Sequence, residues 1–333
     1  MARSTNSAVR QDAAPALSER QQGRVAKRAA AAKPAVKSEP IELPQDIDSS
    51  AAFQLIAASI FRQVGANEGA VRSANPQGVH QMRIGLRRMR AAISVFAQLV
   101  DDPETSRLKQ ELRWLTGRLG PARDLHLLAL RLRRARGAAP ERQKRLQVVE
   151  TMRNEALATA IAALATDRYR KLQTDVLAWI EAGDWLGGAA RRQLPRRARD
   201  FADAVLAKRA RKIARRAREL EALDVEGRHQ LRIAAKKLYY AMGFFESLYD
   251  GRKSRERMAD YQRKVKDLLD HLGALNDLAV QQQLTGSLTP VVRQSDGLAV
   301  IEPSRHERTK TERLLKSAGR AGRELADAKS FWD

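Results

Sequence analysis

The sequence predicts an all-helical protein built from two related halves, and three observations support this fold class. Apolar residues recur at three- and four-residue intervals through most of the chain after residue 46. No segment has the composition and alternation of a convincing strand. One motif occurs twice: HQMRIGLRRMRAAISVF, from His80 to Phe96, returns without a gap as HQLRIAAKKLYYAMGFF, from His229 to Phe245. A repeat of this length indicates two structural units.

The N-terminal region, residues 1–45, is predicted to be a disordered basic tail. It is rich in Ala, Arg, Lys, Pro, Ser and Gln and has no sustained apolar period. Up to Asp46 it holds eight basic and five acidic residues, a net charge of +3. The whole chain carries +23, from 62 basic and 39 acidic residues. Most of the positive charge therefore belongs to the predicted folded domain, residues 46–330.

The first half, residues 46–183, is expected to hold six helices. Ser49 and Ser50 are the predicted N-terminal caps of the first one. The leucines from Leu108 to Leu119 recur at helical spacing, and Gly120 and Pro121 then predict a stop and a new start. The expected helices are 51–64, 76–100, a third ending near 119, a fourth ending near 136, 140–165 and 167–182.

The second half, residues 195–330, follows a Gly-rich break, GDWLGGAARRQLP, at 183–195. Its expected helices are 196–223, 227–249, 254–272, a short one from Asn276, and 304–328. A second repeated motif supports the pairing of the halves, because LGPARDL at 119–125 is answered by LGALNDL at 272–278. Since short connections favour antiparallel neighbours, we expect two antiparallel four-helix bundles related by an internal pseudo-two-fold axis.

Each copy of the long motif predicts a helix with one apolar face and one cationic face. The first cationic stripe consists of His80, Arg83, Arg87 and Arg90, and the second of His229, Arg232 and Lys236. Residues 80–100 include no acidic residue, so the usual pairing along a helix is missing. A solvated helix face is the simpler interpretation of one such stripe. Two copies instead favour a shared basic groove, in which Arg and Lys spaced about 5.4 Å apart would bind a linear chain of phosphates.

The sequence gives little support for disulfides, membrane segments or metal sites. The chain lacks cysteine, which excludes disulfides and thiolate chemistry. It has no run of 18 apolar residues and no signal peptide, so we expect a cytoplasmic protein without a membrane partner. Asp124 and Asp277 are interpreted as helix caps and not as metal ligands. His126 and His271 are expected at the surface or the edge of the core. We predict no metal and no cofactor.

The repeated motifs resemble the CHAD family over about residues 47–328. The resemblance implies two four-helix bundles around a basic central pore that binds inorganic polyphosphate. Carried over by position, the pore residues would be His80, Arg83, Arg87, Arg88, His229, Arg232, Lys236 and Lys237. Tyr239 and Tyr240 depart from the basic character of the first copy. The Glu-x-Glu-x-Lys signature of an associated triphosphate-processing domain is absent, so the chain is similar to stand-alone members.

We therefore predict a non-catalytic protein that binds polyphosphate and is associated with polyphosphate granules and their proteins. Arg90 of the first stripe and Arg123, beside Asp124, are added to the predicted binding residues. Arg209, Lys212, Arg215 and Arg216, in a very basic helix, are possible extensions of the same surface, and a solvated or nucleic-acid-facing helix is an equal alternative. Two alternatives stay open: a nucleic-acid-binding protein that uses this surface, since charge alone does not separate phosphate polymers, and, less favoured, an enzyme that processes polyphosphate or triphosphate.

Overall fold

The computed structural model describes residues 33–134, 140–187, 195–292 and 305–332. Within these ranges the fold is helical, as predicted, with one isolated β-bridge between Asp48 and Arg197. None of the helices described is long and apolar enough to cross a membrane. The α-helices are α2 (Ser49–Ala66), α3 (Glu68–Arg72), α4 (Pro76–Val95), α5 (Pro103–Arg134), α6 (Pro140–Leu164), α7 (Asp167–Ala182), α8 (Ala198–Arg218), α9 (Val225–Phe245), α10 (Arg252–Val292) and α11 (Arg305–Ala326).

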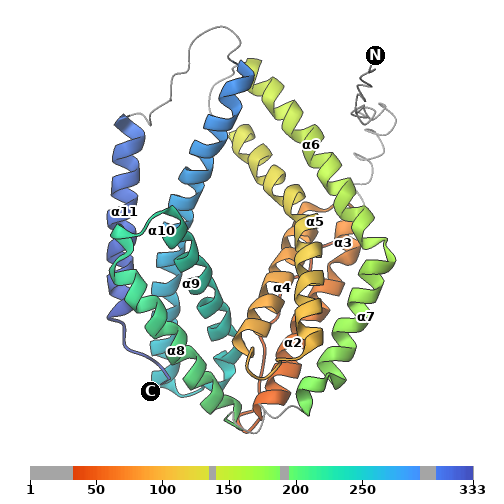
Figure 1. The fold of residues 1–333 in the computed structure, drawn as a ribbon, viewed down its shortest axis with the longest axis vertical. Helices are drawn as coiled ribbons and strands as arrows, with labels where there is room; N and C mark the ends of the chain where they lie inside the picture. The colour runs from red at the N-terminus through yellow and green to blue at the C-terminus, as the bar shows by residue number, and fades with distance from the viewer. Residues whose placement is uncertain (1–32, 135–139, 188–194, 293–304, 333) are drawn as a thin grey trace, which may run out of the picture.

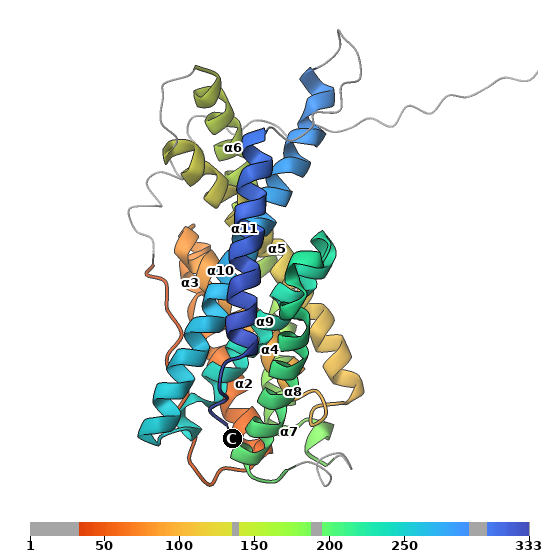
Figure 2. The ribbon, with the colours of Figure 1, turned by 90° about the vertical axis from the view of Figure 1, so that its left-hand side faces the viewer.

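The helices form two groups that converge at the C-terminal ends of α4 and α9, the two helices of the repeated motif (Figure 1). Helices α2 to α7 make up the first group, and α8 to α11 make up the second. Figure 2 shows α11 on the outer side of the second group, where it packs against α8 and α10. The pseudo-two-fold relation between the groups remains a prediction. Contact between α4 and α9 brings the two cationic stripes into one region of the molecule.

An aromatic cluster joins the two groups at the C-terminal ends of α4 and α9. Phe96 and Phe245, the last residues of the two motif copies, have ring centroids 5.6 Å apart. Phe201 of α8 stacks on Phe96 at 4.8 Å, and Phe53 of α2 contacts Phe96 from the other side at 5.2 Å. All four rings are buried. The burial of these four aromatic rings holds the C-terminal ends of α4 and α9 together.

The first helix begins differently from the prediction. Asp48 is its N-terminal cap, and its carboxylate accepts hydrogen bonds from the backbone N–H groups of Ser50 and Ala51 at 2.8 and 2.9 Å. The predicted capping role of Ser49 and Ser50 is therefore wrong. The Ser49 hydroxyl instead donates to the backbone carbonyl of Pro195 at 2.7 Å, which ties the start of α2 to the segment before α8.

The predicted helix breaks inside both LG motifs are also wrong. Helix α5 continues through Pro121, and α10 continues through Asn276. The apolar stripe of α5 stays buried across the proline, at Leu115, Leu119 and Ala122, so tertiary packing outweighs the cost of a proline inside the helix. In Figure 1 the part of α5 after this point leans towards α10.

Part of the predicted tail is folded onto the helices. Residues 1–32 lie outside the described residues, but 33–45 form an extended segment with Ile41 and Leu43 buried. The Leu43 N–H donates to the Ser247 hydroxyl at 2.8 Å, and the Val36 N–H donates to the Asn67 side chain at 3.0 Å. The predicted boundary at residue 45 is therefore too late. Two buried apolar residues are too few to produce a periodic signal in the sequence.

Candidate anion-binding site

Six of the ten predicted binding residues lie on α4 and on the two helices that contact it, α5 and α9. We call this set the central basic cluster, and it consists of His80, Arg83, Arg87, Arg123, Arg232 and Lys236. The two motif helices and α5 supply it because α4 contacts both α5 and α9. Burial lowers the pKa of His80, and the neighbouring charges of Arg123 and Arg87 lower it further. The cluster is therefore a region of strongly positive potential.

Two arginines of the central basic cluster have buried nitrogen atoms without a protein partner. The Nε atoms of Arg87 and Arg232, one on each motif helix, are buried and make no hydrogen bond within the part of the chain that the structure describes. A buried donor left unpaired costs about 1–3 kcal/mol. Most buried polar atoms in folded proteins are paired. These two atoms therefore lack the partners that buried polar atoms usually have.

Lys236 on α9 is affected by cations of both motif helices. Its pKa is lowered from 10.5 to about 8, mainly by burial and then by the charges of Arg232 and Arg87, while Asp277 acts in the opposite direction. Arg87 belongs to α4, so the charge of one motif helix acts on a cation of the other. An anion between them would favour the charged form of Lys236.

Two exposed carboxylates lie beside the central basic cluster. Asp124 is 3.9 Å from the Arg83 guanidinium, whose other contact is a hydrogen bond to the Thr116 carbonyl at 3.3 Å. Asp277 pairs with Arg131 at 3.1 Å, which links α5 to α10. Their predicted role as helix caps is wrong, because both lie inside continuous helices. The two aspartates occupy matched positions of LGPARDL and LGALNDL. Their negative charge partly offsets the positive charge of the central basic cluster.

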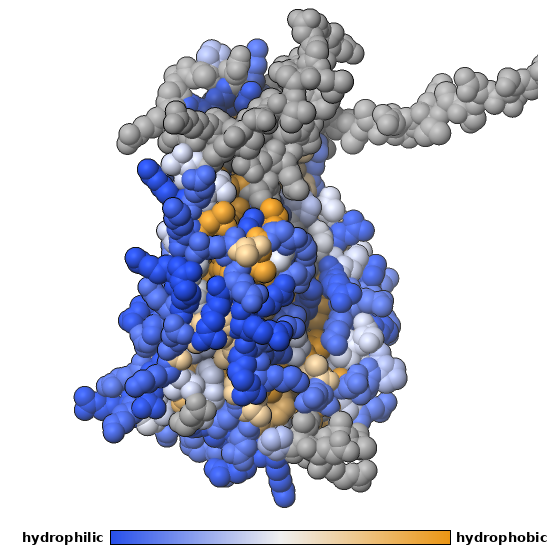
Figure 3. All heavy atoms as spheres, turned by 60° about the vertical axis from the view of Figure 1, so that its left-hand side comes forward, coloured by the Kyte–Doolittle hydropathy of each residue, from blue (hydrophilic) through white to orange (hydrophobic). Residues whose placement is uncertain are grey.

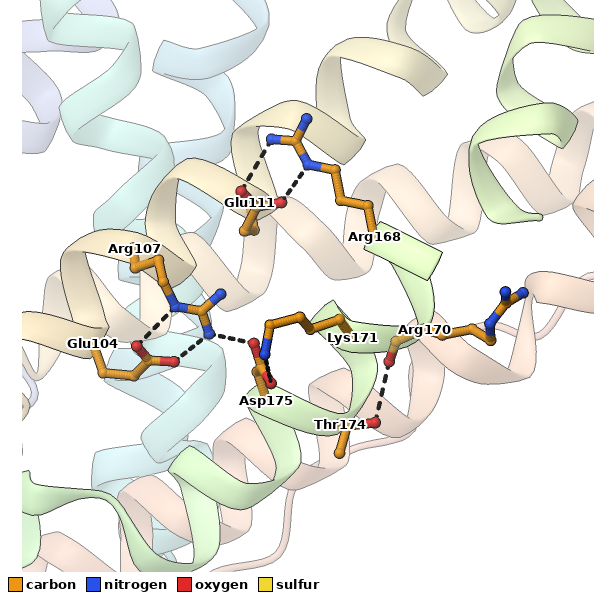
Figure 4. Close-up of polar contacts among 8 residues, drawn as sticks. All are labelled: Glu104, Arg107, Glu111, Arg168, Arg170, Lys171, Thr174 and Asp175. Carbon is orange, nitrogen blue, oxygen red and sulfur yellow. Dashed lines mark hydrogen bonds and ion pairs between the residues drawn. The ribbon is translucent and has the colours of Figure 1, made fainter. Parts of the chain in front are cut away.

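At the contact between α5 and α7, by contrast, cations are paired with carboxylates. Figure 4 shows the contact between α5 and α7, where Arg168 makes two hydrogen bonds to Glu111 at 2.7 and 3.0 Å. Arg107 in the same region bonds to two carboxylates, those of Glu104 and Asp175. Hydrophilic side chains also cover most of the face drawn in Figure 3. The central basic cluster differs from this contact because the buried Nε atoms of Arg87 and Arg232 have no such partner.

The other four predicted residues lie outside the central basic cluster. Arg88 turns towards α2, where it donates to the Gln63 side chain at 3.3 Å, and its guanidinium lies 5.9 Å from the Phe244 ring centroid. His229 is partly exposed on α9, and no described interaction connects it to the central basic cluster. The remaining two, Arg90 and Lys237, join a different set of cations.

This second set, the lateral basic cluster, consists of Arg90, Arg113, Arg209, Lys212 and Lys237. Burial lowers the pKa of Lys237, followed by the charges of Arg209, Arg90 and Lys212. Arg113 of α5 similarly lowers the pKa of Arg90, after burial. The sequence indicated Arg209 and Lys212 as a possible extension, but Arg113 was missed, because nothing in its local pattern shows that it turns towards α4.

His126 is a further residue that the sequence interpretation set aside. Its Nδ1 atom is buried without a hydrogen-bond partner, and burial and the charge of Arg123 lower its pKa. It also contributes to the lowered pKa of His80. Within the described residues, no group of three or more His, Asp or Glu side chains could hold a metal ion.

Comparisons with known proteins match this architecture. The family model of the CHAD domain matches residues 55–285. The crystal structure of the CHAD domain from the plant Ricinus communis superimposes with a TM-score of 0.69 at 25% sequence identity, over 89% of this chain and 98% of that chain. No curated protein sequence matches. Since the family model covers well over half of the sequence, this chain belongs to the CHAD domain family.

Proposed function

We propose that this protein binds inorganic polyphosphate at the central basic cluster and does not catalyse its turnover. The supporting observation is the pair of buried, unpartnered Nε atoms of Arg87 and Arg232, two arginines on different helices whose charges both act on Lys236. Each guanidinium offers a planar set of donors that matches phosphate oxygens. The polyphosphate binding that the family resemblance implies fits this donor set.

A polymer fits the central basic cluster better than a single phosphate. Arg83 and Arg87 are four residues apart on α4, a rise of about 6 Å, and Arg232 and Lys236 repeat this spacing on α9. A chain of linked phosphates presents negative charge at successive points along such rows. Binding would also relieve the repulsion among the cations, which burial makes stronger than in water.

A direct competition experiment tests the proposal. Long-chain polyphosphate and duplex DNA are titrated against the full-length protein at equal phosphate concentration and equal salt, and free phosphate is measured in parallel. We expect polyphosphate to displace DNA and to remain intact. Tighter binding of DNA would support the nucleic-acid alternative, since both polymers carry one charge per phosphate. Release of phosphate would support the enzymatic alternative.

Paired substitutions test whether the central basic cluster is the site. Each charge-assisted contact contributes about 1.5–3 kcal/mol, so replacing Arg87 and Arg232 with Gln should weaken polyphosphate binding by about a hundredfold or more. The matched control replaces Lys253 and Arg257, exposed cations near the start of α10, and removes the same formal charge. Equal losses from the two pairs would contradict a defined site and indicate diffuse attraction.

We further propose that the protein acts in the cytoplasm, on polyphosphate granules and beside other granule proteins. The basis is the proposed ligand: a protein with a site for polyphosphate collects where that polymer is concentrated. Storage, scaffolding and regulation are all compatible with this role.

A further inference from the structure

An extended segment, residues 33–45, crosses from the first group of helices to the second before α2 begins. We call it the N-terminal strap. Figure 2 shows it running from α3 to the end of the molecule where α2 starts. Side chains of the helical groups hold its backbone at several points. Three prolines, Pro34, Pro40 and Pro44, favour an extended backbone and reduce the freedom that the strap loses when it binds to the helices.

The first end of the strap is attached beside the start of α4. The Lys33 N–H donates to the Ser73 hydroxyl, and the Asn75 side chain donates to the Lys33 carbonyl, both at 2.9 Å. Asn75 is also the N-terminal cap of α4, because its side chain accepts from the Gln77 N–H at 2.9 Å. The strap is therefore bonded to the residue that caps α4, on the same helix as His80.

Asn67, between α2 and α3, holds the strap a few residues further on. Its buried side-chain amide accepts from the Val36 N–H at 3.0 Å and donates to the Val36 carbonyl at 2.9 Å. One side chain thus pairs with both backbone groups of one residue, as an adjacent strand would. The same amide donates to the Gln63 carbonyl of α2 at 2.8 Å. Because this amide is buried, detaching the strap would leave part of it unpaired, which favours the attached state.

The other end of the strap is attached to the second group of helices. The Leu43 N–H donates to the Ser247 hydroxyl at 2.8 Å, and the Gln45 side chain donates to the Ser247 carbonyl at 2.7 Å. Ser247 lies in the short 3-10 helix Glu246–Leu248, directly after α9. Ile41 and Leu43 are buried in the common core. The strap therefore connects the start of α4 to the end of α9, the two helices that carry most of the central basic cluster.

The cations of these same two helices repel one another. Arg87 of α4 is among the charges that lower the pKa of Lys236 on α9. The aromatic cluster restrains the two helices at their C-terminal ends, and the strap adds a restraint at the start of α4. The strap holds two lysines and two glutamates, so it contributes no net charge. Its effect on a bound anion is therefore one of position and not of attraction.

We propose that the N-terminal strap is a conformational restraint that holds α4 and α9 at the separation the anion site requires, so that attachment of the strap and binding of the anion favour one another. This inference rests on the proposed function of the central basic cluster. With the strap attached, the cations of both helices contact one chain of phosphates. With the strap detached, their repulsion spreads the two groups and the anion binds more weakly. Because coupling between two sites is reciprocal, bound polyphosphate also holds the strap in place.

The test loosens the strap in the full-length protein without changing its charge. Replacing Ile41 and Leu43 with Ser removes the apolar side chains that anchor it. We expect affinity for long-chain polyphosphate to fall by about tenfold, because apparent affinity falls with the fraction of molecules in the competent state. The salt dependence of binding should stay the same, since no cation is removed. The matched control replaces Val148 and Leu177, two exposed apolar residues, with Ser and should bind like the unsubstituted protein.

A second, milder variant keeps the apolar contacts of the strap. Replacing Ser73 and Ser247 with Ala removes the hydroxyl acceptors at its two ends. Polyphosphate affinity should fall by about threefold. Circular dichroism checks that each variant keeps its helices, and if the first variant unfolds, the second decides the question.

A peptide with the sequence of residues 33–45 separates a restraint on the site from a general gain in stability. Added to the folded Ile41→Ser, Leu43→Ser variant, it should restore most of the lost polyphosphate affinity, and a scrambled peptide of the same composition should not. Saturating polyphosphate should tighten binding of the labelled peptide by the same factor by which the peptide tightens binding of polyphosphate. Because the peptide carries no net charge, attraction between the two ligands does not produce this coupling.

Three outcomes would overturn the inference while leaving the proposed function standing. They are unchanged polyphosphate affinity in the folded strap variants, an equal loss in the control, and peptide binding that does not respond to polyphosphate. If the unsubstituted protein bound no polyphosphate, the proposed function and this inference would fall together.

Discussion

Replacing Lys236 with Met is expected to stabilise the free protein at neutral pH. The folded protein holds the pKa of this lysine at about 8 instead of 10.5, mainly through burial and then through Arg232 and Arg87. At neutral pH that difference corresponds to at most about 3 kcal/mol of destabilisation. Because the side chain is partly exposed and therefore screened, we expect a gain of about 1–2 kcal/mol in the free energy of unfolding.

Because folding lowers the pKa of Lys236, the stability penalty from this lysine depends on pH in a defined range. Below about pH 8 Lys236 is charged in both the folded and the unfolded protein, and the full penalty is present. Between about 8 and 10.5 the unfolded chain binds more protons, so the stability contributed by this group rises with pH. Above that range the lysine is neutral in both states and the penalty disappears. The advantage of Lys236→Met should therefore be largest at neutral pH and shrink towards zero near pH 10.5.

Urea denaturation of the two proteins at neutral pH and at about pH 10 measures this difference. Lys253→Met is the control, because Lys253 is exposed at the start of α10 and should give no pH-dependent difference. The same Lys236→Met variant should bind polyphosphate more weakly, since it loses one cation of the central basic cluster. A stability difference that does not change with pH, or a less stable variant at neutral pH, would refute the electrostatic reasoning.

Two further predictions concern the acidic neighbours and the cellular site. Asp277→Asn removes a carboxylate that offsets the charge of Lys236, so polyphosphate affinity measured by titration should rise by about two- to fivefold. Asp327→Asn, which breaks a comparable exposed pair with Arg218, should leave the affinity unchanged, and an equal gain there would refute the local explanation. A fluorescent fusion should collect on granules and disperse when polyphosphate synthesis is blocked; foci that persist without polyphosphate would contradict granule association.

The all-helical fold and the grouping of cations on the two motif helices could be predicted because the motif repeats an amphipathic pattern. The positions of His80, Arg83 and Arg87 on one face follow from helical geometry alone. The second copy then predicts that Arg232 and Lys236 also share a face. These inferences need only the local sequence, and all five residues lie in the central basic cluster.

The helix boundaries and the surroundings of the other cations depend on tertiary packing, which local sequence patterns do not specify. Pro121 has the local properties of a helix start, yet it lies within α5 because buried neighbours on both sides hold the helix together. Arg88 and Arg90 are two residues apart in the motif, and only the packing of α2 and α8 against α4 and α9 decides that they serve different surroundings. Arg113 is distant in sequence from both motif copies.

The segment 33–45 has a consequence for how much of the chain must be kept together. It makes hydrogen bonds to Asn67 in the first group and to Ser247 in the second. One extended segment therefore contacts both groups of helices and connects them. It also begins well before residue 55, where the match to the family starts. The shortest fragment that preserves the arrangement of α4 and α9 is therefore longer than the domain that sequence similarity delimits.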